Sequence, residues 1–368
     1  MAYTTIDDPT AYFQTKTYTG SAGSQSITFD GNSDLQPDWI WIKERGAAGG
    51  HVVTDTVRGI SASSAPFLQP SSTGAEIDAN GTEANRTLTS SNTNGFTLGQ
   101  DAYYTNFNNN SDTYVSWNWK AGTSFTNDAS STGIGSIDSA GSANDTAGFS
   151  IVTYTGTGSN GTIKHGLSTA PKMIITHQIG GGEWYTYHTG IASDAETDFL
   201  NLHVTVAVSD DAEMWNDTKP TTSVFSVGVN GNTNGSSDAT IAYCFAEKQG
   251  YSKFSSYVGN GSDTPNGVFI WLGFKPAFIL IKATDSNSWV IVDNKRPADS
   301  NPVDSSLAAD STAAETTGDS NTTFDFLSNG FRTNGNSGNN NSSGQKYIYM
   351  AFAEQPFVSS SGVPATAK

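Results

Sequence analysis

The residues of this chain best suited to chemistry are five histidines, a single cysteine and a few loops rich in acidic side chains. His177 and His188 fall on neighbouring expected strands, but a metal site needs a third ligand and supporting partners, and neither can be named. Cys244 lies in an apolar run, so we interpret it as a buried strand residue, and one cysteine leaves no intrachain disulfide. We predict no metal site and interpret the histidines as isolated strand residues; they are His51, His165, His177, His188 and His203.

Two acidic loops, residues 30–34 and 209–213, place several oxygen ligands close together in the sequence. Calcium takes about six to eight such oxygens, but neither loop has the spacing of a known calcium motif. Solvated turns are the favoured interpretation of both loops, and a cation site is the alternative.

The segment Gly156–Gly161 matches a dinucleotide-binding fingerprint as a string of letters. Such a loop binds phosphate only where it opens a helix, and residues 162–166 after it show no helical period. We therefore predict a hairpin loop at this place. The sequence contains no nucleophile elbow, HExxH, P-loop or CxxC string, so we predict no catalytic residues and no cofactor.

The eight tryptophans are the remaining candidates for contact with a ligand. Most fall in expected strands, where packing in the core is the default. Trp215 differs because Asn216 and Asp217 follow it, and an indole can stack on a sugar while such groups bond the sugar hydroxyls. We predict a contact with a glycan or a partner at Trp215, Asn216 and Asp217. The alternative is a loop that fills its own domain or contacts another subunit.

The composition indicates an all-β protein with an acidic surface. Charged residues are only 14% of the chain, whereas the many β-branched and aromatic residues suit strands and the surplus of Gly, Asn, Ser and Asp suits turns. The net charge of -17 disfavours nucleic acid as a partner, because phosphate backbones repel an acidic surface. The N-terminus shows no secretion signal and no apolar run approaches the length of a membrane span, so we expect no membrane insertion.

The chain passes three times through one pattern of strands. Each pass opens with a tyrosine two positions before a glycine, at Tyr18, Tyr154 and Tyr257. A proline then opens a second strand, a third strand follows, and an aromatic strand closes the pass. A unit of about 100 residues built in this way has the size of a β-sandwich or jelly roll. We predict three tandem units of this kind, with antiparallel strands and little helix.

The closing strand of the first unit shows the clearest alternation. Its residues 116–119 read Ser-Trp-Asn-Trp, so we predict that the two tryptophans face a core and that Ser116 and Asn118 face water. A sheet that is buried on one face and solvated on the other is common among antiparallel sheets.

Composition also indicates the boundaries of the units. Residues 123–146 are nearly all Gly, Ser, Thr, Ala, Asn and Asp, which is typical of a flexible linker, although an extended arm on a neighbour has the same composition. The second and third units are joined directly, so we expect them to form a compact pair. We predict a first unit with an N-terminal arm over 1–122, the linker, a second unit over 147–250, a third over 251–357 and a loose tail over 358–368.

Several strings are similar to those of uncharacterised repeat-containing proteins of marine tailed phages. They are Pro37–Lys43, Asp55–Gly59, Ser116–Gly122, His165–Leu167 before Ala170 and Pro171, and Ala351–Phe357. The resemblance covers nearly the whole chain and implies a virion structural protein, often fibre-like and homotrimeric, with no catalytic residues to carry over. The second and third units lack the Trp-Asn-Trp and Asp-Thr-Val-Arg-Gly strings, so we expect only the first unit to share their role.

These observations predict a virion structural protein, either a tail fibre or appendage that contacts the host or a head decoration protein. We expect it to be made in the host cytoplasm and released on lysis. Its expected partners are other virion proteins, copies of itself in a homotrimer, and a host surface glycan. A lectin-like carbohydrate-binding module is the first alternative. A tailspike that cuts polysaccharide is the second, since the sequence holds many carboxylates from which its catalytic pair could come.

Overall fold

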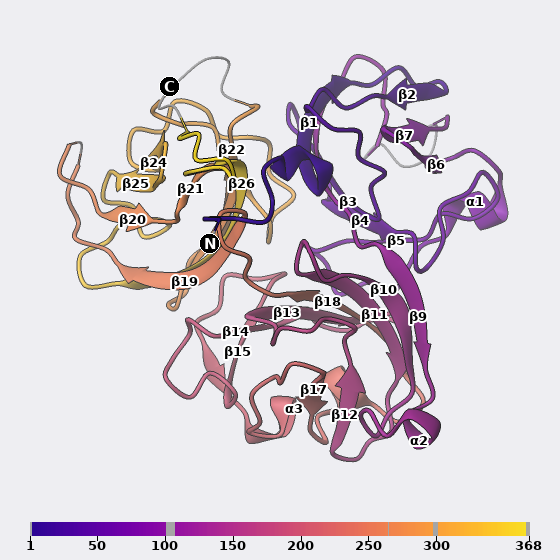
Figure 1. The fold of residues 1–368 in the computed structure, drawn as a ribbon. Coiled ribbons are helices and arrows are strands. Elements are labelled where there is room, and N and C mark those ends of the chain that lie inside the picture. Colours follow the sequence, from indigo (N-terminus) through magenta and orange to yellow (C-terminus); the bar gives the residue numbers. More distant parts are fainter. Residues whose placement is uncertain (1, 101–106, 264, 297–300, 366–368) are drawn as a thin grey trace.

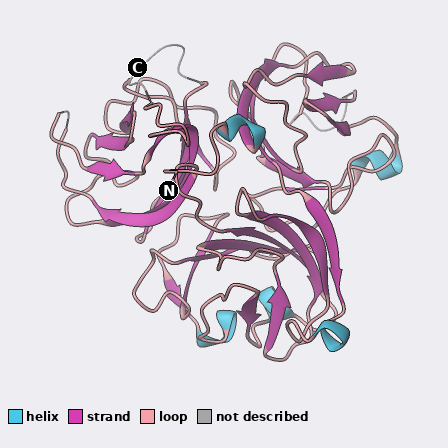
Figure 2. Cartoon of the chain, viewed as in Figure 1, coloured by secondary structure: helices cyan, strands magenta, loops and turns pink. Residues whose placement is uncertain are grey.

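The regular secondary structure of the described residues is almost entirely antiparallel β-sheet, joined by loops and a few short helical turns (Figure 2). The computed structural model describes residues 2–100, 107–263, 265–296 and 301–365. Strands take 41% of the chain and helices 5%, which confirms the prediction of an all-β protein built from sandwich-like units. The helical segments are η1 (Pro9–Ala11), α1 (Ala79–Thr82), α2 (Ala129–Thr132), α3 (Ala212–Trp215) and α4 (Gly231–Asn234).

Three sandwich-like units follow one another along the chain with the same topology. In each larger sheet, the strand that opens the unit pairs with the strand that closes it. The closing strand pairs on its other side with the second strand of this sheet in chain order, and the third and fourth strands follow in turn. In the first unit these strands are β1 (Phe13–Thr19), β8 (Thr113–Trp119), β3 (Trp39–Glu44), β4 (Val52–Asp55) and β5 (Phe67–Leu68). Its smaller sheet contains β2 (Gln25–Ile27), β7 (Gly95–Leu98) and β6 (Leu88–Asn92).

The second and third units repeat this strand order. The second unit contains β11 (Phe149–Thr155), β18 (Ala239–Phe245), β13 (Met173–Gln178), β14 (Tyr185–His188), β15 (Asp198–Asn201) and β16 (Ser209–Asp210), with β12 (Gly161–Lys164) and β17 (Val224–Val227) in its smaller sheet. The third contains β19 (Ser252–Val258), β26 (Lys346–Pro356), β21 (Phe274–Ala283), β22 (Trp289–Asp293) and β23 (Leu307–Ala308), with β20 (Phe269–Trp271), β25 (Gly330–Asn334) and β24 (Thr323–Leu327) in its smaller sheet.

The three units surround a common centre (Figure 1). Their larger sheets face inward and their smaller sheets lie on the outside of each lobe. One buried hydrophobic cluster runs through all three larger sheets, and a second cluster fills the sandwich of the first unit. The start of the chain lies against the third unit, where Tyr3 Oη donates to the carbonyl of Gly273 at 2.8 Å. The N-terminal segment thus ties the first unit to the third, and the shared hydrophobic cluster joins both of them to the second. We call the whole arrangement the three-unit ring.

The tyrosine and glycine that open each unit belong to a buried turn. In the first unit, Tyr18 Oη donates to the carbonyl of Phe107 at 2.7 Å, and the amide of Asn108 donates to two loop carbonyls. A Cβ on Gly20 would lie 2.1 Å from the carbonyl oxygen of Asn109, so only glycine fits there. The other units repeat these contacts with Tyr154, Gly156 and Asn234 and with Tyr257, Gly259 and Asn341. The repeated pattern therefore marks a structural turn rather than a binding motif.

Residues 123–146, expected to be a flexible linker, are instead part of the second unit. They form β9 (Thr123–Asn127), α2 and β10 (Ser139–Asn144), and the two strands extend the larger sheet beyond β11 to eight strands. The composition misleads because these strands are held mainly by backbone hydrogen bonds, which join β10 to the edge of β11 and β9 to β10. Gly141 permits their close approach, since a Cβ there would lie 2.0 Å from the carbonyl oxygen of Ile151.

The described part of the C-terminal tail is held in place, so the prediction of a loose tail is wrong for residues 358–365. The amide of Ser359 donates to the carbonyl of Val363 at 2.8 Å, which closes a turn. The amide of Ser360 donates to the carboxylate of Asp7 at 2.6 Å, which ties that turn to the start of the chain. Residues 366–368 lie outside the described part.

Strand β8 is buried on both faces, so the prediction that Ser116 and Asn118 face water is wrong. Both residues are 0% exposed. They share a face with Tyr114, which belongs to the cluster inside the first unit. Trp117 and Trp119, on the opposite face, are part of the cluster that joins the three units. The small polar residues face the sandwich interior and the large aromatic residues face the centre of the molecule.

Candidate functional site

The centre of the three-unit ring is filled by aromatic side chains from one position of the three closing strands. The strand registers align Trp119 of β8 with Phe245 of β18 and Phe352 of β26. The ring centroids of Trp119 and Phe352 are 5.6 Å apart, and those of Phe245 and Phe352 are 6.2 Å apart. Each of these residues is at most 1% exposed. Burial of large apolar surfaces therefore holds the units together.

Wherever two units meet, the residue that ends the third strand of one unit reaches the closing strand of the next. Between the first and second units, Asp55 accepts a hydrogen bond from Tyr243 Oη at 2.9 Å. Between the third and first, Asp293 accepts one from Trp117 Nε1 at 2.9 Å. Between the second and third, His188 Nε2 lies 3.1 Å from a backbone carbonyl oxygen of β26. Since the registers place these three residues at one position, an approximate threefold axis relates the three contacts, which we call the joints.

A second set of hydrogen bonds across the joints follows the same symmetry. In each unit, a side chain at the start of the third strand, or directly before it, lies near a backbone carbonyl of the preceding unit. That carbonyl belongs to the last residue of the fourth strand or to the residue directly after this strand. The pairs are Trp184 with Gln69 at 3.1 Å, Trp289 with Asn201 at 2.8 Å, and His51 with Ala308 at 3.0 Å. Each joint therefore combines aromatic packing with hydrogen bonds at two matched places.

Two of the joints contain a buried ion pair. Arg58 Nε donates to Asp55 at 2.7 Å, and Arg296 Nε donates to Asp293 at the same distance, with all four side chains at most 4% exposed. The third unit therefore keeps the acid and the arginine of the Asp-Thr-Val-Arg-Gly string, contrary to the expectation that only the first unit shares it. The sequence signal was the Asp-x-x-Arg spacing alone, because the residues around it differ. In the second unit, Ile191 stands at the arginine position.

All five histidines are buried in the structure. His177 and His188 do not meet across β13 and β14, because His188 pairs with Met173 whereas His177 stacks on Trp184 with 4.3 Å between ring centroids. Burial lowers the pKa of His188 to about 4, and it lowers the pKa of His51 to about 3. These imidazoles are neutral near pH 7 and act as hydrogen-bond partners rather than as proton carriers.

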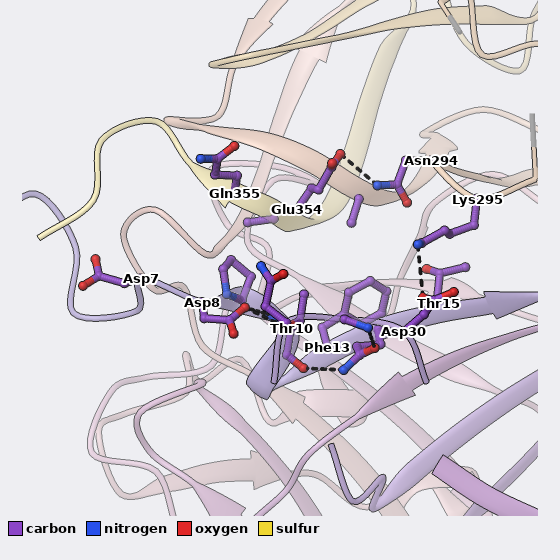
Figure 3. Close-up of a pocket in the computed structure, with 16 residues that line it drawn as sticks. Asp7, Asp8, Thr10, Phe13, Thr15, Asp30, Asn294, Lys295, Glu354 and Gln355 are labelled. Atoms are coloured by element: carbon purple, nitrogen blue, oxygen red, sulfur yellow. Dashed lines mark hydrogen bonds and ion pairs between the residues drawn. The ribbon is translucent and has the colours of Figure 1, made fainter. Parts of the chain in front are cut away.

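A cleft of about 350 Å³ separates the N-terminal segment and β1 from the third unit (Figure 3). Loop residues 30–32 close one side of it, and residues 294–295 and 353–355 close the other. We call it the acidic cleft, because the charged side chains that line it are Asp7, Asp8, Asp30, Glu354 and Lys295. Sequence reasoning missed this cleft, since no sequence pattern brings residues from the two ends of the chain together.

Every carboxylate of the acidic cleft already has a partner. Asp30 forms ion pairs with Lys16 at 3.0 Å and with Lys295 at 3.2 Å. Partial burial acts to raise the pKa of Asp30, but the two lysines lower it overall. The other partners are Ser360 for Asp7, Thr10 and Ser33 for Asp8, and Lys275 and Asn294 for Glu354. The arrangement bridges the first and third units and leaves none of these four carboxylates without a partner.

Trp215 is buried, so the predicted glycan contact of this residue is wrong. It is 2% exposed, and its Nε1 donates to the carbonyl of Asp198 at 3.1 Å. Asp211 caps α3, and this single turn places the indole inside the second unit. Asn216 and Asp217 then follow with φ angles of 52° and 44°; Asn216 is half-buried and Asp217 is exposed, and the buried indole is not available beside them to stack on a sugar. The alternative interpretation, a loop that fills its own domain, matches the structure.

The other sequence candidates occupy structural positions. Cys244 is 0% exposed in β18, and burial raises the pKa of its thiol. The Gly156–Gly161 loop leads into strand β12 rather than into a helix, as predicted. Among the described residues, no group of three or more His, Cys, Asp or Glu side chains could hold a metal ion. No helix in this part of the chain is long and apolar enough to cross a membrane.

A protein-family model matches residues 8–356 and is described as a domain of unknown function, DUF7483. The match begins beside η1 and ends with β26, so it spans all three units. The domain that defines the family therefore corresponds to the three-unit ring rather than to a single repeat. No curated protein matches the chain.

Proposed function

Because the chain belongs to the DUF7483 family, whose domain is of unknown function, we propose its role from its own geometry and from the strings it shares with phage proteins. The proposed role is that of a structural protein of a tailed-phage particle. It forms part of a tail fibre or appendage that contacts the host, or it decorates the head. We propose no catalytic activity for it.

The proposal rests on one observation, namely that the histidine and acidic side chains best suited to chemistry lie at the joints between units. His51, His188, Asp55 and Asp293 each bind across a joint between units. Enzymes place such groups in a cleft, where shifted pKa values serve a reaction with a bound substrate. In this chain the same groups hold three sandwiches together as one body, which suits a building element of a particle.

The acidic cleft supports a structural role over a polysaccharide-cutting one. A glycosidase needs one carboxyl group with a raised pKa to act as the general acid beside a second carboxylate. Hydrogen bonds from Ser360 lower the pKa of Asp7, and the lysine pairs outweigh burial in lowering that of Asp30. These two groups are therefore ionised near neutral pH and suited to ion pairing.

The proposed partners are other virion proteins and copies of the chain itself in a homotrimer. The joints already bury the inner faces of the three units within one chain, so a homotrimer forms through the outer surfaces. Nucleic acid is not a proposed partner, because the net charge of -17 repels phosphate. The protein is made in the host cytoplasm and reaches the medium on lysis, as part of the virion.

The test is detection of the chain in purified particles from lysed producing cells. Mass spectrometry should find it beside the major head protein, and immunogold labelling in negative stain should place it on the tail or on the head. Light scattering of the purified chain should give three times the 38.7 kDa mass of one copy. Absence of the chain from particles in which the head protein is detected would contradict the proposal.

A further inference from the structure

Trp271 lies on the surface, whereas the other seven tryptophans of the chain are buried, so the expectation of core packing is wrong for this residue. Trp271 is 45% exposed, and Phe269, two positions earlier on β20, is 47% exposed. Ile270 between them is buried, so both aromatic side chains point outward from the same face of the strand. We call Phe269 and Trp271 the aromatic ledge; β20 lies on the outer side of the third unit (Figure 1).

The other two units have polar residues where the third has the aromatic ledge. The registers align Ile270 with Ile27 of the first unit and with Ile163 of the second, because each pairs with a phenylalanine of the next strand. The flanking residues are Ser26 and Thr28 in the first unit, Thr162 and Lys164 in the second, and Phe269 and Trp271 in the third. The same fold thus forms without aromatic side chains at these places. Their presence in the third unit points to a contact outside the chain.

Trp271 is held in position by neighbouring aromatic side chains. Its indole makes a T-shaped contact with Phe357, at 5.3 Å between ring centroids, and Phe357 makes another with Tyr3 at 6.3 Å. Tyr3 is fixed in turn by its hydrogen bond to Gly273. A side chain that is already immobilised loses little freedom when a ligand binds, so the aromatic ledge is preorganised.

A guanidinium–carboxylate pair lies beside the aromatic ledge. Arg332 pairs in register with Phe269, and Asp325 pairs with Arg332, so the three side chains share the outer face of the smaller sheet. Arg332 Nη2 lies 2.6 Å from Asp325 Oδ2, and the arginine side chain is 29% exposed. The sheet therefore offers flat apolar surfaces with hydrogen-bonding groups next to them.

We propose that the aromatic ledge binds uncharged sugar residues of a polysaccharide. The C–H faces of the sugars stack on Trp271 and Phe269, and their hydroxyls bond to the partly exposed guanidinium of Arg332, which two hydrogen bonds to the buried Asp325 hold in place. Outward side chains two residues apart on a strand are separated by about 7 Å, which is enough for two neighbouring sugar rings. The inference goes beyond the particle role and does not depend on it.

The size and charge of the surface favour a sugar over a macromolecular partner. Each aromatic side chain offers about 150–250 Å², so two that are about half exposed offer roughly 200 Å². A stable protein interface needs about 800 Å² from each partner. Nucleic acid bases also stack on aromatic side chains, but the net charge of -17 repels their phosphates.

The test uses the purified full chain on an array of bacterial surface oligosaccharides together with cello-, chito- and malto-oligosaccharides. The wild-type chain should bind at least one uncharged oligosaccharide. Phe269→Ser and Trp271→Thr, which introduce the residues of the first unit at the same places, should each weaken that binding tenfold or more. Val258→Ser is the control, because it removes another exposed apolar side chain of the third unit, 55% exposed, and should leave binding unchanged.

A second measurement uses the isolated exposure of Trp271. N-bromosuccinimide should oxidise one tryptophan of the folded chain, and the oligosaccharide that binds on the array should slow this oxidation. A blank array, or equal binding by the wild type and by Trp271→Thr, would overturn the proposal. The proposal would also be overturned if the array stayed blank and virions with Trp271→Thr lacked another particle protein. That result would identify the aromatic ledge as a contact with a protein. Binding by a chain that is absent from particles would leave this inference standing and remove only the particle role.

Discussion

The joint between the first and second units and the joint between the second and third use different chemistry at the same place. At the first, Asp55 forms a buried ion pair with Arg58 and accepts a hydrogen bond from the neighbouring unit. At the second, the neutral imidazole of His188 approaches a backbone carbonyl, and Ile191 takes the arginine position. Both joints exclude water and satisfy the buried polar group. The last residue of the third strand therefore has to form a hydrogen bond across the joint, but it does not have to be charged. Where it is part of an ion pair, loss of one member leaves a buried charge that lowers the stability of the fold.

Loss of one member of an ion pair should have the largest effect. Asp293→Ala leaves the Arg296 guanidinium, 0% exposed, without its closest partner. The free energy of unfolding should fall by about 3–5 kcal/mol in urea denaturation. The double variant Asp293→Ala with Arg296→Met should recover part of this loss, because it removes the guanidinium left without its carboxylate, while Glu315 keeps its ion pair with Arg45. A loss below about 1 kcal/mol in the single variant would show that the pair has little influence on the joint.

The histidine joint should make the protein less stable in acid. Unfolded His188 takes up a proton near pH 6.5, whereas in the fold burial lowers its pKa to about 4. The unfolded state binds more protons between these values, so the free energy of unfolding falls as the pH falls through this window. At pH 4, protonation of His188 in the unfolded state should lower the free energy of unfolding by about 3 kcal/mol relative to neutral pH.

Urea denaturation of the wild type and of His188→Gln at pH 7, 5.5 and 4 measures this contribution. The variant should be less stable at pH 7, but its stability should depend less on pH between 6.5 and 4. Equal pH dependence of the two proteins would mean that other groups, such as the carboxylates, account for the acid sensitivity.

Removal of one hydroxyl group from the first joint should have a smaller effect. Tyr243→Phe deletes the hydroxyl that donates to Asp55 at 2.9 Å and accepts from Arg58 Nη2 at 3.3 Å, while the ion pair between Asp55 and Arg58 remains. We expect a loss of about 1–2 kcal/mol in the same urea assay. Tyr349→Phe is the matched control in the third unit, since His188 uses the backbone carbonyl of that residue. A larger loss in the control would refute the view that the tyrosine hydroxyl belongs to the joint.

The smallest effect is expected on the outer surface. Trp271→Thr should lower the free energy of unfolding by no more than about 1 kcal/mol, because it loses only the ring contact with Phe357, and Thr28 occupies the same place in the first unit. Removal of Trp119 from the centre, as Trp119→Ala, should cost about 3–5 kcal/mol. Thermal unfolding followed by circular dichroism compares the two variants. Similar melting temperatures for them would show that the aromatic ledge is part of the fold.

The repeat and the strand content were predictable because they depend on local patterns. Tyr18 and its two counterparts stand at fixed distances from a glycine, and turn residues separate the strands, so the sequence indicates three β units. The strands β9 and β10 were not predictable in the same way. Their residues bind through the backbone, which every composition offers, and Gly141 becomes informative only when its neighbour Ile151 is known.

The surface contact predicted for Trp215 and the core packing expected for Trp271 failed for a related reason. Trp215 is followed by polar residues, yet the turn of α3 carries the indole inward and leaves Asn216 and Asp217 outside. Trp271 stands in a strand, yet it lies on the outward face of a small sheet. Neighbours in the chain indicate the local structure of a residue, but its exposure depends on which face of that structure another element covers.

The β units follow from local sequence patterns, whereas the ion pairs at the joints and the ring arrangement follow from contacts between distant parts of the chain. Composition, alternation and the recurring tyrosine and glycine were enough to determine an all-β chain with three copies of one unit, because strands and turns depend on nearby residues. No local pattern indicates that the larger sheets face one another, so that Trp117 Nε1 donates to the carboxylate of Asp293 in another unit. A face of a sheet is a core or a surface according to the partner that covers it, and that partner lies far away in the chain.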